Sequence, residues 1–255
     1  MTSQTERRQG RAVLILQARM GSTRLPGKSM MDMAGAPLVG RILERVKRTP
    51  GLADIVLAIP DTAADRPLAE LGAAYGVSVF RGSENNLLDR YYQAALASRA
   101  DIVLRLPADN VTPEPEAIAA ILAYHRTGAA GFSSNLSVIG DSGWPDGIGA
   151  EAFDFAALAE IKAEEADPRR LEHVHLNFFD YSTQTPARPE RYSIGTIPCP
   201  PEFRRPDLVL DVNTIEQYRF MRRIYEDLYP TNPQFHITDI IRWYDTVWLP
   251  ERNRV

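Results

Sequence analysis

The sequence predicts an α/β fold built on a doubly wound, mostly parallel sheet with a small β-containing lobe. In the first half of the chain, short apolar runs alternate with segments whose apolar residues have helical spacing. Runs that are apolar at nearly every position are typical of strands buried on both faces, as in a parallel sheet. Helices between such strands imply right-handed crossovers that cover the sheet on both sides.

The first half is expected to hold four buried strands and the helices that connect them. Pro37 is well placed in the first turn of the first helix, and Thr62 with Asp65 and then Asn86 provide capping signals for the next two. A further helix opens after Glu114. The predicted strands are residues 12–16, 54–59, 77–80 and 101–106, and the first and third helices span 37–48 and 87–98.

Beyond Gly128 the pattern changes to shorter strands around a connection rich in glycine, aspartate and proline. Strands are expected at 130–136, 149–155, 192–197 and 208–210, and helices at 155–165, 168–181, after an Asn213 cap, and at 236–246. We find no linker that would separate independent domains. The organisation predicted is a single domain over 12–250, with 128–155 and 191–200 contributing to an acceptor or dimerisation lobe and 1–11 as a flexible tail.

Composition limits the kinds of partner. The chain has 255 residues and a net charge of −4, which gives no global reason to expect nucleic-acid binding. Cys199 is the only cysteine, so neither a disulfide nor a cysteine-rich zinc site is available within one chain. No stretch approaches the roughly 18 apolar residues that a membrane span requires. We therefore expect a cytoplasmic protein that binds neither membrane nor nucleic acid.

A basic loop follows the first strand directly and is the main candidate for a ligand site. Gly21 and Gly27 permit close backbone approach, and Arg19, Arg24 and Lys28 supply three cations. Backbone N–H groups can line an anion, arginines can clamp it with two hydrogen bonds each, and lysine adds a compact charge. This combination suits a triphosphate, although its spacing is not that of the P-loop or the dinucleotide fingerprint. The alternative is a solvated basic surface loop.

Two aspartates at predicted strand ends are candidate metal ligands. Ligands of parallel sheets bind beyond the carboxyl ends of the strands, which places the basic loop and Asp109 on one rim. Asp211 ends a later strand. Magnesium is held by one or two carboxylates together with phosphate oxygens and waters, so this pair would suffice. Each aspartate also has the alternative role of a helix cap or turn residue.

The segment R-M-G-S-T-R-L-P-G-K, residues 19–28, resembles the nucleotide-binding signature of the cytidylyltransferases that activate acidic sugars. These include the CMP-KDO and acylneuraminate cytidylyltransferases, and the resemblance is closest to the spore coat polysaccharide biosynthesis branch. It covers roughly residues 12 to 245. The resemblance implies a Rossmann-like fold of the nucleotide-diphospho-sugar transferase type, CTP as substrate, Mg²⁺ as cofactor and a homodimer.

The resemblance also assigns roles to individual residues. Asp109 and Asp211 match metal-binding positions, Asp146–Gly147 with Glu151 and Glu172–His173 resemble acceptor motifs, and the chain departs from the family at Ala108 and at Asn110. The implied catalytic residues are Lys28, Arg19 and Asp109, and the metal ligands are Asp109 and Asp211. The implied nucleotide-binding residues are Gln17, Ala18, Arg19, Gly21, Ser22, Arg24, Lys28, Arg105 and Pro107, and the acceptor-binding residues are Asn110, Asp146, Glu151, Glu172 and His173.

The function expected from these features is transfer of CMP from CTP to an acidic sugar or similar small acceptor, with release of pyrophosphate, in surface polysaccharide or glycoconjugate biosynthesis. One alternative is a nucleotide-sugar-dependent glycosyltransferase, but such enzymes typically carry an Asp-x-Asp motif that residues 109–111 lack. The other is a catalytically silent nucleotide-binding subunit. The joint presence of the three cations of the loop and both aspartates argues against it.

Overall fold

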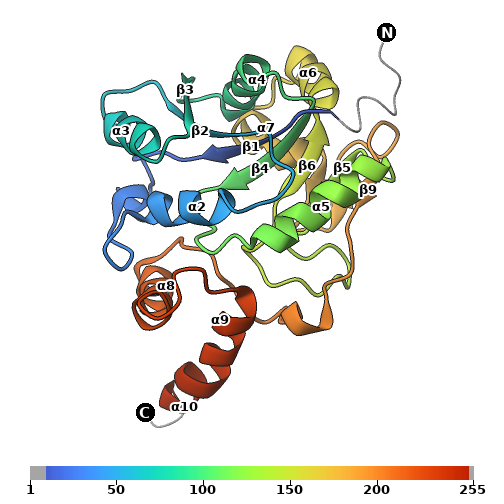
Figure 1. Cartoon of the computed structure of the whole chain (residues 1–255). Coiled ribbons are helices and arrows are strands. Elements are labelled where there is room, and N and C mark those ends of the chain that lie inside the picture. Colours follow the sequence, from blue (N-terminus) through green and yellow to red (C-terminus); the bar gives the residue numbers. More distant parts are fainter. Residues whose placement is uncertain (1–9, 253–255) are drawn as a thin grey trace.

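The computed structural model describes residues 10–252, and its centre is a seven-stranded sheet in the order β3-β2-β1-β4-β6-β5-β9 (Figure 1). β1, β2, β3 and β4 are parallel, β6 is antiparallel to both β4 and β5, and β5 is parallel to β9. A separate pair, β7 and β8, is antiparallel. The strands are β1 (Ala12–Gln17), β2 (Asp54–Pro60), β3 (Ser78–Gly82), β4 (Ile102–Pro107), β5 (Phe132–Ser134), β6 (Glu151–Asp154), β7 (Phe179–Asp180), β8 (Thr185–Pro186) and β9 (Ile194–Gly195).

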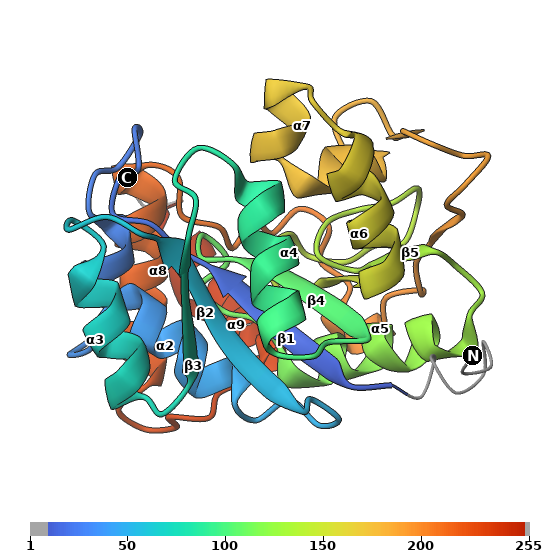
Figure 2. The ribbon, with the colours of Figure 1, turned by 90° about the horizontal axis from the view of Figure 1, so that it is seen from above.

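Helices cover both faces of this sheet, as Figures 1 and 2 show. One face packs against α2 (Leu38–Val46), α3 (Arg66–Ala74) and α5 (Pro115–Thr127). The other packs against α4 (Leu87–Ala97) and α6 (Phe155–Glu164). The remaining helices are α7 (Pro168–Glu172), α8 (Ile215–Leu228), α9 (Ile237–Trp243) and α10 (Leu249–Arg252), and the short turns are η1 (Lys28–Met30), η2 (Val174–Asn177), η3 (Pro201–Phe203) and η4 (Tyr244–Trp248). The predicted doubly wound, mostly parallel α/β fold is confirmed.

β1 lies at the centre of the sheet because both of its faces are apolar. Residues 12–16 are fully buried, and alternate side chains enter the two cores that lie on opposite sides of the sheet. In the register with β4, Gln17 lies opposite Pro107, so the two strands end side by side. This pairing places the loop after β1 beside the residues that follow β4, as the sequence predicts.

Two predicted segments differ from the structure for identifiable reasons. The helix expected over 168–181 is wrong beyond Glu172, because Asn177 donates its side-chain amide to the carbonyl oxygens of Arg170 and Val174, which a continuous helix would use. The strands within 128–155 and 191–200 enter the main sheet as β5, β6 and β9. The contribution of these segments to acceptor binding or dimerisation stays a prediction.

Smaller differences concern helix ends and short strands. Asp65 does not cap α3 with its side chain, and the N-cap residue of α8 is Thr214 instead of Asn213, in a capping box with Gln217. Residues 208–210 form no strand of the sheet but make an isolated bridge to Asp146. The last predicted helix ends at Trp243 and continues as a π-turn.

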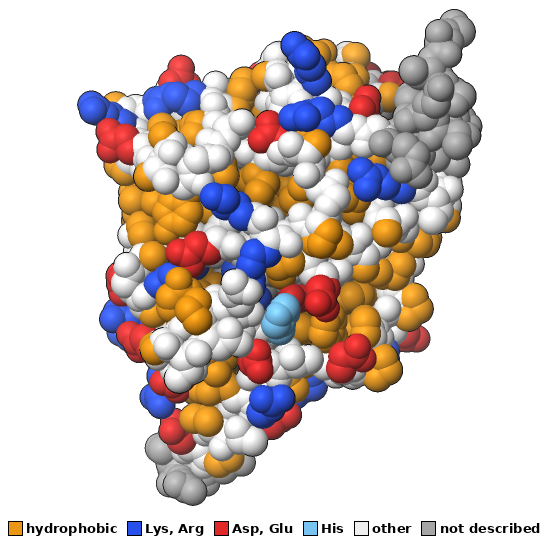
Figure 3. All heavy atoms as spheres, viewed as in Figure 1, with side chains coloured by type: hydrophobic (Ala, Val, Ile, Leu, Met, Phe, Trp, Pro, Cys, Tyr) orange, Lys and Arg blue, Asp and Glu red, His pale blue; other side chains and the backbone are white. Residues whose placement is uncertain are grey.

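Charged side chains of both signs lie on the surface. Acidic and basic side chains are interspersed over the face seen in Figure 3. Among residues 10–252, no helix combines the length and the apolar character that crossing a membrane would take. The predicted flexible tail, 1–11, lies outside the described residues except for its last two positions.

A buried ion pair attaches the C-terminal helices to the sheet domain. Glu114 is 0% exposed. Its Oε2 accepts a hydrogen bond from the backbone N–H of Ile237 at 2.9 Å and lies 3.4 Å from the guanidinium of Arg45. Its Oε1 lies 2.9 Å from Nδ1 of His236. Arg45 also donates to the carbonyl oxygens of Pro113 and Phe235. One carboxylate thereby joins α2, the start of α5 and the start of α9.

We expect Glu114→Gln to lower the free energy of unfolding by about 3 kcal/mol or more, because it leaves the buried Arg45 without a counter-charge. Urea denaturation followed by circular dichroism measures this loss. The control is Glu70→Gln, which removes an exposed ion pair with Arg66 and should change the free energy of unfolding by less than about 0.5 kcal/mol. Equal losses in the two variants would contradict a stabilising role for the buried pair.

Candidate active site

The loop after β1 is held in one shape by its own backbone and by a buried carboxylate. Gly27 has a φ of 70°, in the left-handed region that suits glycine, and its N–H donates to the carbonyl oxygen of Met20. The Met20 N–H in turn donates to Asp65 at 2.8 Å, and Thr62 donates to the other oxygen of that carboxylate at 2.6 Å. The capping signal seen in the sequence therefore serves the loop instead of the helix.

The three cations of the loop point to different partners around one cavity. Lys28 Nζ donates to the carbonyl oxygen of Val212 at 2.7 Å and lies 4.0 Å from Asp109 Oδ2. Arg24 donates to Asn213 at 2.6 Å, and Arg19 lies 3.3 Å from Glu172 on α7. Burial lowers the pKa of Lys28, and the nearby Asp109 carboxylate partly offsets this effect.

Backbone pairing between distant segments brings the segments of Asp109, Asp146 and Asp211 to one end of the sheet. The Val212 N–H donates to the carbonyl oxygen of Asp109 at 2.8 Å, and the backbone of Asp146 pairs with residues 208–210. Gly147 has a φ of 93°, and a Cβ there would lie 3.1 Å from the Leu210 carbonyl group. Glycine is therefore required where these segments cross.

The electrostatics of this acidic group favour a cation. Burial, followed by the charges of Asp211 and Asp109, raises the pKa of Asp146 to about 6. Burial and the Asp109 charge also raise the pKa of Asp211. Asp109 Oδ1 is buried and has no hydrogen-bond partner among the described residues, whereas the oxygens of Asp211 accept from the side chains of Asn213 and Gln217.

A second group of lining residues comes from β4, β6 and the segment after α7. Arg105 on β4 lies 2.8 Å from Glu151 on β6, and Tyr181 lies 3.0 Å from the other oxygen of this glutamate. His175 lies against Tyr181, with 5.6 Å between ring centroids. Burial, with the neighbouring Arg105 charge, lowers the pKa of His175 to about 3, so its imidazole is neutral at physiological pH.

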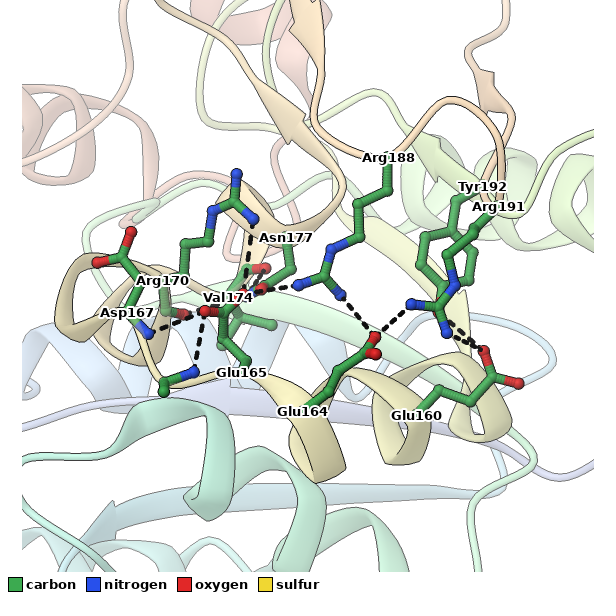
Figure 4. A network of polar contacts seen from close by, with 11 residues as sticks. Glu160, Glu164, Glu165, Asp167, Arg170, Val174, Asn177, Arg188, Arg191 and Tyr192 are labelled. Carbon is green, nitrogen blue, oxygen red and sulfur yellow. Dashed lines mark hydrogen bonds and ion pairs between the residues drawn. The ribbon is translucent and has the colours of Figure 1, made fainter.

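A network of ion pairs holds α7, which forms one wall of the cavity, against the end of α6 (Figure 4). Glu165 accepts from Arg188 at 2.6 Å and lies 3.5 Å from Arg170 on α7. Its other oxygen accepts the N–H of Asp167, whose side chain caps α7 through the Arg169 N–H. This support fixes the wall that carries Glu172 and His173.

These elements enclose one cavity of about 620 Å³ at the carboxyl ends of β1 and β4, which contribute Gln17 and Pro107 to its lining. Gly21 and Asp211 are absent from its lining, although Asp211 is attached to the lining residue Asn213 by a side-chain hydrogen bond. Every other residue to which the sequence assigns a catalytic, metal, nucleotide or acceptor role lines the cavity, namely Gln17, Ala18, Arg19, Ser22, Arg24, Lys28, Arg105, Pro107, Asp109, Asn110, Asp146, Glu151, Glu172 and His173.

The lining residues that the sequence analysis does not single out include Arg90, His175 and Tyr181, whose side chains can bind a substrate or adjust its surroundings. Arg90 offered a signal, because it occupies the buried face of α4 with Leu87 and Ala94 at helical spacing. His175 and Tyr181 lie within the helix predicted over 168–181, and nothing in that helical pattern directs their side chains toward the carboxyl ends of the strands. The break at His173 turns this segment toward the cavity.

A doubly wound sheet with a basic loop and strand-end carboxylates defines a nucleotide-binding α/β enzyme. A family model described as cytidylyltransferase matches residues 13–160, which is more than half of the chain. The chain therefore belongs to the cytidylyltransferase family, and the nucleotidyltransferase predicted from the sequence is confirmed.

Individual relatives agree with this assignment. The spore coat polysaccharide biosynthesis protein SpsF of Bacillus subtilis is 28% identical over 84% of this chain and 86% of the relative. A 3-deoxy-manno-octulosonate cytidylyltransferase of Anaeromyxobacter dehalogenans is 38% identical over 46% of this chain and 48% of the relative. A solved cytidylyltransferase from Leptospira borgpetersenii superposes with a TM-score of 0.80 at 25% identity, covering 92% of this chain and 94% of that chain.

Proposed function

We propose that this protein transfers CMP from CTP to a small acceptor that carries an acid group, with release of pyrophosphate. The observation that carries the proposal is the single cavity that three cations of one loop share with the carboxylate of Asp109. A triphosphate needs cations along its length, and its reaction needs a metal-binding carboxylate beside them. The names of the relatives support the substrates, because SpsF acts in polysaccharide synthesis and the Anaeromyxobacter relative is named for a sugar acid.

Asp109 and Asp211 are the proposed ligands of a divalent cation, for which we favour Mg²⁺. The free Oδ1 of Asp109 and the raised pKa of Asp211 support this assignment, since each marks negative charge without full compensation. Residues 10–252 contain no cluster of three or more Asp, Glu, His or Cys side chains that could hold a metal ion by themselves. Phosphate oxygens of the nucleotide would therefore complete the coordination.

The remaining residues bind and orient the reactants. Arg19, Arg24 and Lys28 would contact the phosphate oxygens. The Lys28 ammonium would stabilise the negative charge that develops on pyrophosphate as it leaves. The divalent ion, when bound, neutralises the triphosphate and polarises the α-phosphoryl group. In this proposal, Gln17, Ala18, Gly21, Ser22, Arg105 and Pro107 complete nucleotide binding, and Asn110, Asp146, Glu151, Glu172 and His173 bind the acceptor.

The proposed acceptor site lies beside α7, where Glu151, Glu172 and His173 line the cavity together with the neutral imidazole of His175. Glu151 also engages Arg105 and Tyr181, so the same carboxylate would orient this nucleotide-binding arginine. The two other functions considered, glycosyl transfer and silent nucleotide binding, predict no pyrophosphate release. This difference makes the reaction itself the test.

We expect pyrophosphate release from CTP, in preference to ATP, GTP and UTP, when the protein is given Mg²⁺ and a panel of sugar acids. Asp109→Asn and Asp211→Asn should each remove most of this activity, because a neutral amide is a poor magnesium ligand. Asp61→Asn, at an exposed aspartate paired with Arg81, is the control and should behave as the parent. Parent-like turnover of either test variant would show that the residue is not a ligand.

Lys28→Ala should lower kcat/KM on the order of ten- to a hundredfold, the effect of one charge-assisted contact in the transition state. Lys28→Arg should also be impaired, since the larger planar guanidinium cannot replace a compact ammonium. The matched control is Lys47→Ala, because Lys47 also donates to a backbone carbonyl, that of Tyr75, but lies outside the cavity. A loss below about threefold for Lys28→Ala would assign Lys28 to loop structure only.

A homodimer is proposed from the family resemblance. The apolar strands after Gly128 do not need a second copy to cover them, because the chain itself buries Phe132 and Phe153 at 0% exposure. Light scattering at micromolar concentration should report twice the mass of the chain. A monomer under these conditions would refute the dimer and leave the proposed reaction unaffected.

A further inference from the structure

Arg90 differs from the other buried arginines in having no carboxylate partner. Four arginines of the described chain are at most 5% exposed, namely Arg41, Arg45, Arg90 and Arg105. Three of them form ion pairs, with Glu44, Glu114 and Glu151 respectively. No carboxylate oxygen of the described residues lies within 4.0 Å of the Arg90 guanidinium. Its Nη1 donates a hydrogen bond to the carbonyl oxygen of Ser83.

The surroundings of Arg90 are unfavourable for a positive charge. Arg90 is the fourth residue of α4, whose N-terminal end carries partial positive charge, and side chains there point back toward that end. Arg19 is a second cation nearby, and burial lowers the pKa of Arg90. Two carboxylates favour the charge from beyond 4.0 Å, namely Glu84 and Asp65, and Asp65 is committed to the Met20 N–H and to Thr62. A buried charge in such a position is destabilising unless something else compensates it.

The position of Arg90 indicates which group could compensate its positive charge. Arg90 lines the same cavity as Arg19 and Lys28, and its Nε is buried without a hydrogen-bond partner. Gln17 Oε1, also a lining group, is buried and unpartnered as well. An arginine with a free donor at the edge of a substrate cavity is suited to a phosphate or carboxylate oxygen.

We propose that Arg90 is a substrate-binding residue that donates from its guanidinium to an anionic oxygen of a bound substrate. Two substrates of the proposed reaction could supply this oxygen, the phosphates of CTP and the acid group of the acceptor. The nearness of Arg19 favours the phosphates. This inference rests on the proposed function for the identity of the substrates, but binding without turnover tests it separately.

The experiment compares Arg90→Met and Arg90→Lys with the parent by isothermal titration calorimetry, using CTP with Mg²⁺ and, separately, 3-deoxy-manno-octulosonate. Arg90→Met should weaken CTP binding on the order of tenfold or more, and Arg90→Lys should fall between Arg90→Met and the parent. Parent-like CTP binding with weaker binding of the sugar acid assigns the carboxylate as the source of the oxygen. If the parent does not bind the sugar acid, the CTP titration alone decides. The control is Arg81→Met, which removes a partly exposed arginine that pairs with Asp61 and lies outside the cavity. This variant should bind both ligands as the parent does.

Thermal unfolding distinguishes binding from a structural role. If Arg90 is an uncompensated charge in the free protein, Arg90→Met should unfold at or above the Tm of the parent and should show a smaller rise in Tm with CTP. A lower Tm with unchanged affinity for both ligands would overturn the proposal. CTP binding that depends on Arg90 in a protein that releases no pyrophosphate would keep this proposal and refute the proposed reaction.

Discussion

Backbone hydrogen bonds between three segments far apart in the sequence are the constraint on which the site depends. The residue after Asp211 donates to the carbonyl oxygen of Asp109, and Asp146 pairs with the strand-like segment that precedes Asp211. These bonds bring the segments of all three aspartates to the end of β4, where burial and then like charges raise the pKa values of Asp146 and Asp211. Gly147 makes the crossing sterically feasible. The charges are thus held together by the backbone, whose hydrogen bonds do not depend on whether a cation is bound.

Charge compensation separates Arg90 from the other buried arginines, including Arg105 of the same cavity. Arg45 and Arg105 are buried with carboxylates, and each pair joins elements that are distant in sequence. Arg90 is equally buried but faces the cavity without such a partner. Buried charges that are paired within the chain support the fold, whereas one left for a ligand makes the free protein less stable than it could be. The same reasoning explains why the acidic side of the cavity favours a cation.

The wall opposite the basic loop shows how a short helix can be positioned without a core of its own. α7 has no fully buried residue, and only its partly buried Leu171 packs against the core on the α4 side of the sheet. Ion pairs from Glu165 to Arg170 and Arg188, and the cap from Asp167, add to this limited packing. Asn177 ends the helical run and allows His175 to face the cavity. Local polar contacts therefore decide which side chains reach the proposed acceptor.

The sequence by itself determined the strands of the parallel sheet, the basic loop and the position of Asp109, because each depends on short-range patterns such as continuous burial and glycine-framed turns. The pairing of Gln17 with Pro107 followed from the rule for parallel strands. The tertiary structure alone decided that Asp65 holds the loop, that Arg90 lacks a counter-charge, and that the strands after Gly128 complete the main sheet. The physical reason is that these outcomes depend on contacts between residues far apart in the chain. Hydrophobic periodicity carries no information about which polar groups those contacts will satisfy.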